Sequence, residues 1–197
     1  RMALRHQGQP LPLDAAALKA TLAGATGRVV VLLHGLCMND RQWRREGTDH
    51  GALLARDAGY TPVYLHYNTG LHISLNGREL ADQLDLLWTA WPRPVERLAL
   101  VGHSMGGLLA RSAIEQGRLA GRAWAGRVDD LVCMGSPHHG APLERAGHWV
   151  DILLGATPYA APFARLGKLR SAGITDLRYG NLLDEDWVGQ DRFARGA

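Results

Sequence analysis

The chain has 197 residues, 46% of them hydrophobic, which suffices for one substantial buried core and indicates a single domain. The formal net charge of +3 comes from arginines scattered among acidic residues, so no basic block predicts a nucleic-acid partner. No apolar run reaches the roughly 20 residues of a membrane-spanning helix, and no cysteine or histidine spacing predicts a metal site.

Four short apolar runs predict buried strands. They are Val29–Leu33, Pro62–Tyr67, Leu98–Val101 and Leu131–Met134, and the first is rich in β-branched residues. A continuous apolar run of this length is typical of a strand that is covered on both faces.

Helical patterns separate these runs. Leu53–Ala58 predicts a short helix ended by Gly59. Asn76, with Glu79 three residues later, has the spacing of a helix N-terminus, and the helix that follows should end before Pro92. A third helix is expected from Leu108 to about Gly117. The alternation predicts an α/β fold with a mostly parallel sheet and helices on both faces.

The carboxyl ends of parallel strands share one rim, where ligands bind in such sheets. The residues that follow the first, third and fourth strands should therefore converge. They are His34-Gly35-Leu36, Gly102-His103-Ser104 and Gly135-Ser136-Pro137-His138.

Ser104 lies in a Gly-x-Ser-x-Gly motif, which is a weak signal alone but here follows a strand and opens a helix. Gly102 and Gly106 leave room where a Cβ would collide. The hydroxyl should be pushed up and out at the helix N-terminus, where a developing oxyanion is favoured. The competing interpretation is that Ser104 only caps the helix.

Acyl transfer needs two donors to the oxyanion. One candidate is the amide of Met105, directly after the nucleophile. The other is the amide of Leu36, because Gly35 lets the loop turn inward. His34-Gly35 could instead be an ordinary turn at the end of a strand.

Three motifs in order carry a resemblance to a known family. They are His34-Gly35-Leu36, Gly102-His103-Ser104-Met105-Gly106-Gly107 and Gly135-Ser136-Pro137-His138-His139-Gly140-Ala141-Pro142. Over residues 28–145 the chain resembles the α/β-hydrolase superfamily, specifically bacterial lipase/esterase proteins and their PGAP-like relatives. The resemblance implies Ser104 as nucleophile, the Leu36 and Met105 amides as oxyanion donors, ester or lipid substrates and no cofactor. It makes His103 a packing residue, and we expect His138 and His139 to be structural.

The resemblance breaks toward the C-terminus. The family order places the acid and the histidine after later strands, but no histidine follows His148, and Ile174–Tyr179 is only weakly strand-like. We expect residues 1–197 to be one α/β-hydrolase domain that is incomplete at its C-terminal end. Alternatively, His139 or His148 acts as base with Asp151 or Asp176, or the chain is a non-catalytic or partner-completed binding module.

Residues 141–173 are apolar, are broken by prolines and fall where lipase relatives insert a lid. Trp149, Ile152, Leu153 and Phe163 would line an acyl pocket there, or would simply pack on the sheet. The leading hypothesis is a serine carboxylic-ester hydrolase, although the same motif also serves amide and thioester cleavage. The cytoplasm is the default location, and secretion would follow if an upstream signal was removed.

Overall fold

The computed structural model describes residues 1–138 and 171–188. Its N-terminal elements are β1 (Ala3–His6), β2 (Gln9–Pro10), α1 (Ala15–Thr21), β3 (Arg28–Leu33), the 3-10 helix η1 (Asp40–Trp43), β4 (Arg44–Arg45), β5 (Thr48–Asp49) and α2 (His50–Ala58). There follow β6 (Thr61–His66), α3 (Ile73–Ala90), β7 (Arg97–His103), α4 (Met105–Leu119), η2 (Ala123–Gly126), β8 (Val128–Met134), α6 (Ala172–Tyr179) and η4 (Asp184–Asp186).

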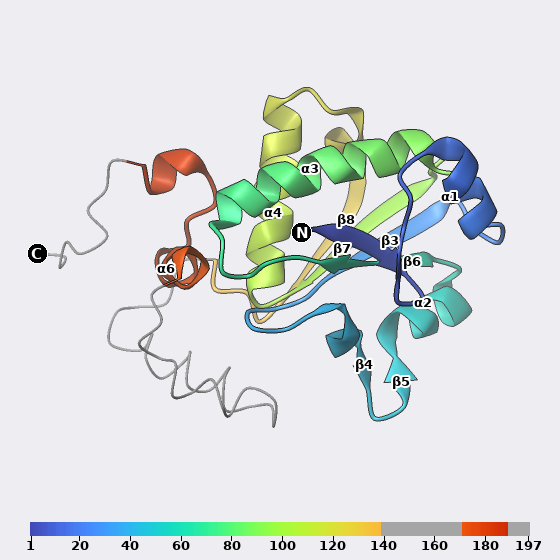
Figure 1. Cartoon of the computed structure of the whole chain (residues 1–197), viewed down its shortest axis with the longest axis horizontal. Coiled ribbons are helices and arrows are strands. Elements are labelled where there is room, and N and C mark those ends of the chain that lie inside the picture. The colour runs from blue at the N-terminus through green and yellow to red at the C-terminus, as the bar shows by residue number, and fades with distance from the viewer. Residues whose placement is uncertain (139–170, 189–197) are drawn as a thin grey trace, which may run out of the picture.

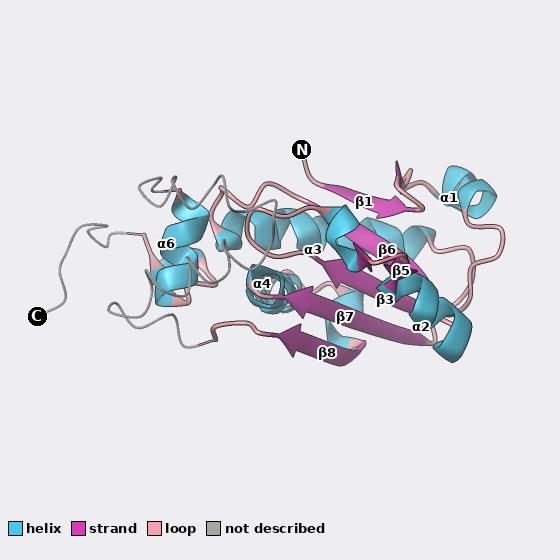
Figure 2. Cartoon of the chain, turned by 90° about the horizontal axis from the view of Figure 1, so that it is seen from below, coloured by secondary structure: helices cyan, strands magenta, loops and turns pink. Residues whose placement is uncertain are grey.

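The main sheet has the strand order β2-β1-β6-β3-β7-β8 (Figure 1). β3 lies between β6 and β7 and is parallel to both, and β8 is parallel to β7. β1 and β2 form an antiparallel edge beside β6. In Figure 2 the arrowheads of β3, β7 and β8 point toward the side of the molecule where α6 lies. The predicted parallel sheet is therefore confirmed, and its carboxyl rim is on the α6 side.

The sheet buries both faces because the side chains of β3 alternate between two apolar clusters. Val29, Val31 and Leu33 belong to the large cluster, which also contains residues of α1, α3 and α4. Val30 and Leu32 belong to a smaller cluster that includes Trp43 of η1 and is flanked by Leu54 of α2. Helices thus cover both faces, as the continuous apolar strands indicated.

The start of α3 differs from the sequence-based prediction. The helix begins at Ile73, and Asn76 lies buried inside it, where its side-chain amide donates to the Asn68 carbonyl at 2.9 Å. The Ile73 amide donates instead to the carboxylate of Asp176 at 2.6 Å. Asp176, which is distant in sequence, therefore caps the N-terminus of α3, and the helix start predicted from the Asn76–Glu79 spacing was wrong.

Two other segments also differ from the prediction. Residues 174–179, the nearest thing to a late strand, form most of the helix α6, which Ser171 caps at its N-terminus and Gly180 ends in a left-handed conformation. Before Val29, where no strand was predicted from the sequence, β1 and β2 form the antiparallel edge. Antiparallel edge strands this short carry too little apolar periodicity to stand out in a sequence.

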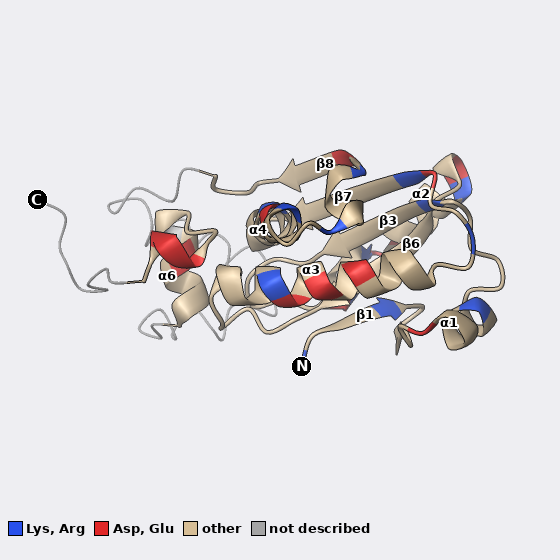
Figure 3. Ribbon diagram, turned by 90° about the horizontal axis from the view of Figure 1, so that it is seen from above, with Lys and Arg blue, Asp and Glu red and all other residues tan. Residues whose placement is uncertain are grey.

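β8 forms the other edge of the sheet as far as the described residues extend. Its hydrophobic side chains remain partly open to solvent: Leu131, Val132 and Met134 are each exposed. The ribbon of α3 is coloured at its charged residues, which are Arg78, Glu79, Asp82 and Asp85, and none of these four is buried (Figure 3). Among the helices of the described ranges, none is both long and apolar enough to pass through a membrane.

Candidate active site

Ser104 occupies a sharp reversal between β7 and α4, with φ 54° and ψ −119°. A positive φ is costly for a residue with a side chain, so this conformation persists only where its surroundings impose it. The flanking glycines are required sterically. A Cβ on Gly102 would lie 2.4 Å from the Gly107 nitrogen, and one on Gly106 would lie 2.3 Å from the Leu33 oxygen. The backbone geometry is that of a nucleophile elbow.

The Ser104 side chain is buried, with only 1% exposed, whereas the sequence predicted that it would be pushed out into the open. The loop after β3 explains the difference, because Gly35 packs so closely that a Cβ there would lie 3.3 Å from the Cβ of Ser104. The Ser104 hydroxyl has no hydrogen-bond partner among the described residues. A buried hydroxyl without a partner is uncommon and needs a specific explanation.

Between Gly35 and Met38, in the loop after β3, one backbone amide has no acceptor among the described residues. The Gly35 amide donates to Gln42 Oε1 at 3.0 Å, the Cys37 amide to Thr69 Oγ1 at 3.3 Å, and the Met38 amide to the Gly35 carbonyl at 3.3 Å. The Leu36 amide donates to none of the described residues, and the same holds for the Met105 amide at the start of α4. These are the two donors predicted from the sequence.

His34 holds this loop from inside the protein. Its ring is fully buried and stacks on Tyr67 with a centroid distance of 4.3 Å. Nδ1 lies 3.0 Å from the Gly35 carbonyl, which can only accept, so Nδ1 carries the proton. The Tyr67 hydroxyl donates to the His34 carbonyl at 2.8 Å. Burial lowers the pKa of His34 from 6.5 to about 4, so the ring is neutral at pH 7.

The elbow is supported from the loop after β8. The Ser136 hydroxyl donates to the Ser104 carbonyl at 2.7 Å, and the Ser104 amide donates to the Met134 carbonyl at 2.8 Å. His138 lies farther along this loop, with Nδ1 2.9 Å from a guanidinium nitrogen of Arg111. The predicted convergence of the three loops is therefore observed, although no role for Ser136 was predicted.

His72 and Asp176 form a buried pair beside the rim. Nδ1 of His72 is 3.1 Å from both carboxylate oxygens, and the indole of Trp187 stacks on the imidazole at 3.7 Å. The pair places α6 next to the first turn of α3 (Figure 1). Gly173, the second residue of α6, packs where a Cβ would lie 3.0 Å from the Met105 side chain.

The His72–Asp176 pair bears on the alternative in which Asp176 would be the carboxylate partner of a catalytic histidine. Asp176 was considered as the partner of His139 or His148, but its carboxylate is committed to His72, Ile73 and Asn181. His139, His148 and Asp151 lie outside the described residues. So do the predicted pocket residues Trp149, Ile152, Leu153 and Phe163. The expected lid over 141–173 also lies outside them, except that its last residues lead into α6.

No histidine in the described ranges hydrogen-bonds to the Ser104 hydroxyl. His103 is adjacent in sequence, but its Nδ1 is 2.9 Å from Gln42 Nε2, and partial burial lowers the pKa of its ring. The role of His103 as a packing residue, which the resemblance implied, stays a prediction. The described part of the chain brings the loop after β3 close to Ser104, but it places no base on the Ser104 hydroxyl.

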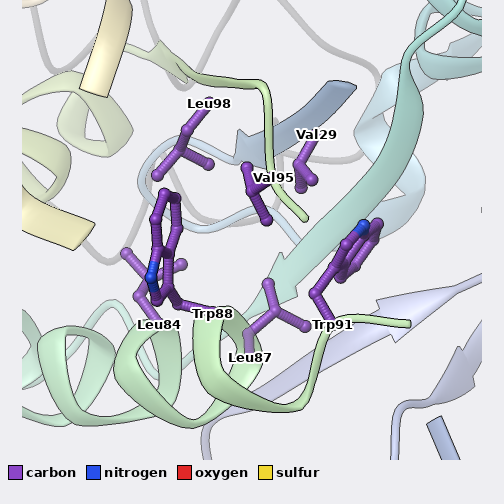
Figure 4. Close-up of a pocket in the computed structure, with 7 residues that line it drawn as sticks. All are labelled: Val29, Leu84, Leu87, Trp88, Trp91, Val95 and Leu98. Carbon is purple, nitrogen blue, oxygen red and sulfur yellow. The ribbon is translucent and has the colours of Figure 1, made fainter. Parts of the chain in front are cut away.

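An apolar crevice elsewhere is not part of this site. It is lined by Val29, Leu84, Leu87, Trp88, Trp91, Val95 and Leu98 (Figure 4). Val29 and Leu98 lie near the amino ends of β3 and β7, at the opposite end of the sheet from Ser104. The lining has no nucleophile, acid or base, so the crevice offers packing and no chemistry.

Some of the solved structures with a similar fold are named as lipases or esterases. The mature form of Bacillus licheniformis lipase BlEst2 has a TM-score of 0.56 and 21% identity, with 91% of this chain and 61% of that chain covered. Its propeptide form gives the same TM-score and identity, with 91% of this chain and 33% of that one covered. A Pyrococcus furiosus esterase has a TM-score of 0.48 and 16% identity, with 80% and 59% covered.

The chain thus spans less than two thirds of the length of the mature lipase. No curated protein matches it by sequence. A family model described as the PGAP1-like alpha/beta domain matches residues 24–189, which is most of the chain. Together with the parallel sheet and the strained serine between β7 and α4, this match shows that the chain belongs to the PGAP1-like alpha/beta domain family, within the α/β-hydrolase superfamily.

Proposed function

We propose that this protein is a serine carboxylic-ester hydrolase that acts through an acyl-enzyme on Ser104. The observation that carries the proposal is the combination at one residue of a strained backbone and a buried hydroxyl without a partner among the described residues. Neither feature helps folding, because each costs free energy. Both are useful if the hydroxyl must attack a bound carbonyl. The lipase and esterase names of structural neighbours agree with this class.

In the proposed reaction the Ser104 oxygen attacks the ester carbonyl carbon while a histidine accepts its proton. The negative charge that develops on the carbonyl oxygen is stabilised by the amides of Leu36 and Met105. The bond to the leaving alcohol then breaks, the alcohol takes the proton from the histidine, and the acyl group stays on Ser104. Water then attacks the acyl carbon while the histidine accepts a proton from it. The bond to the Ser104 oxygen breaks, Ser104 takes the proton back, and the carboxylic acid is released.

The base and its orienting carboxylate come from outside the described residues in this proposal, because no described histidine binds Ser104. We also propose that the chain forms one α/β-hydrolase domain and that residues 141–173 act as a lid. Trp149, Ile152, Leu153 and Phe163 would supply the apolar surface for the acyl group. A small-molecule ester or a lipid is the substrate that such a surface fits.

The test is active-site labelling of the intact protein with a fluorophosphonate probe, together with hydrolysis of p-nitrophenyl esters of two to sixteen acyl carbons. Wild-type protein should be labelled and Ser104→Ala should not. Ser112→Ala is the matched control, because it removes another buried serine hydroxyl of α4, one that donates to the Leu182 carbonyl at 2.6 Å. Equal labelling of wild type and Ser104→Ala would refute the proposal, and the acyl-length profile would separate esterase from lipase activity.

A further inference from the structure

We propose that Gln42 is a positioning residue that holds the two halves of the oxyanion site in register; this inference rests on the proposed function. The two amides come from different parts of the fold: Leu36 follows β3, whereas Met105 follows β7. Hydrogen-bond donors stabilise an oxyanion only if both lie within about 3 Å of one point. The function therefore requires a contact that holds the loop after β3 in a fixed position relative to the turn at Ser104.

The side-chain amide of Gln42 spans that junction. Its Oε1 accepts from the Gly35 amide at 3.0 Å, and its Nε2 lies 2.9 Å from Nδ1 of His103. Gly35 directly precedes Leu36, and His103 directly precedes Ser104. One side chain from η1 thus binds the residue directly before Leu36 and the residue two positions before Met105, although Gln42 and His103 are 61 positions apart in sequence.

Hydrogen-bond chemistry fixes the direction of this bridge. The Gly35 amide can only donate, so the glutamine oxygen must face it. The NH₂ group then faces His103, whose Nδ1 must accept and therefore carries no proton. His103 is neutral with its proton on Nε2, which agrees with the lowering of its pKa by burial. Turning the amide over would set its NH₂ group against the Gly35 amide and leave two donors facing each other.

The bridge also keeps the Gly35 amide away from the substrate. With this donor bound to Gln42 and the Cys37 amide bound to Thr69, the Leu36 amide is the one between them without a described partner. Without Gln42 the Gly35 amide would lose its acceptor, and the loop could turn to satisfy it. The Leu36 amide would turn with the loop, since the two amides belong to successive peptide units.

Three substitutions in the intact protein separate positioning from packing. Gln42→Met keeps the length of the side chain and removes both hydrogen bonds. Gln42→Glu keeps the acceptor for Gly35 and can still bind His103, provided that Nδ1 takes up a proton. Gln83→Met on α3 is the matched control, because it makes the same chemical change at a half-buried glutamine whose Oε1 has no partner among the described residues.

Gln42→Met should lower kcat for p-nitrophenyl ester hydrolysis about 10- to 100-fold with little change in KM, because a misplaced donor weakens mainly the transition state. Gln42→Glu should recover most of that loss, and Gln83→Met should match wild type. In nitrogen-15 spectra of the imidazoles, His103 should change from a bare Nδ1 in wild type to a protonated Nδ1 in Gln42→Glu. Packing alone predicts the opposite order of activities, because methionine is accommodated more easily than a partly buried charge.

The outcomes are distinguishable. If wild type hydrolyses esters and Gln42→Met does so equally well, the role of Gln42 is refuted while the proposed function stands. The same conclusion follows if Gln42→Glu is no better than Gln42→Met. If wild type shows neither hydrolysis nor labelling at Ser104, both proposals fall together.

Discussion

Asp176 accepts hydrogen bonds from His72 although the two residues are 104 positions apart in sequence. Its carboxylate is fully buried and also accepts from the Ile73 amide at 2.6 Å and from the Asn181 side chain at 3.3 Å. One side chain of α6 therefore closes the first turn of α3 and orients the imidazole beside it. This arrangement fastens α6 to the rim that carries Ser104.

Asp176→Ala should be strongly destabilising, because it leaves the His72 ring nitrogen and the Ile73 amide buried without their acceptor. Removing one member of a buried, hydrogen-bonded pair costs about 3–5 kcal/mol. Urea unfolding followed by circular dichroism measures this loss. Glu79→Ala removes an exposed carboxylate from α3 and should leave the unfolding midpoint where it is. An equally small effect at Asp176 would contradict a structural role for the pair.

His34 should make the folded state sensitive to acid. In the unfolded chain its pKa is near 6.5, whereas burial lowers the folded value to about 4. Between these values the unfolded state binds the extra proton, so the stability that is complete above pH 6.5 declines as the pH falls toward 4. The difference amounts to about 3 kcal/mol.

His34→Asn tests this linkage, because an amide nitrogen can replace the Nδ1 donor to Gly35 but does not titrate. Urea midpoints measured between pH 7 and pH 4.5 should fall less steeply for the variant than for wild type. Parallel pH dependences in the two proteins would mean that another group causes the acid sensitivity.

Gly102→Ala should disrupt the elbow. The added Cβ would meet the backbone of α4 at 2.4–2.5 Å, and backbone atoms cannot swing aside as a side-chain end can. We expect a loss of about 3 kcal/mol or more in the free energy of unfolding, together with loss of labelling at Ser104. Gly24→Ala is the matched control, because a Cβ there would meet nothing within 4 Å. Wild-type behaviour of Gly102→Ala would show that the turn is less tightly packed than described.

The central sheet could be predicted from the sequence because each buried strand is a short, continuous run of apolar residues. The run from Val29 to Leu33 is apolar throughout, and a strand covered on both faces needs no other signal. The elbow was predictable for a similar reason, since its glycines and its place between a strand and a helix are all local. That the loops after β3 and β7 would meet followed from the rule that parallel strands end at one rim, and the role of the Leu36 and Met105 amides as oxyanion donors stays a prediction.

The features that escaped prediction depend on contacts distant in sequence. Asp176 caps α3 across the fold, and Gln42 joins Gly35 to His103, yet neither residue stands out in its own neighbourhood. The burial of Ser104 depends on how closely Gly35 approaches, which is a matter of tertiary packing. Local patterns report propensity and periodicity, whereas these contacts exist only after the chain has folded.

The positive φ of Ser104 has an evolutionary consequence. A conformation of this kind costs a non-glycine residue about 1–3 kcal/mol, and glycine would adopt it without that penalty. Selection for thermal robustness alone would therefore favour a mutation of this codon to glycine. In the proposed function, the strained backbone is what the fold gives up in stability to present a serine hydroxyl at this turn.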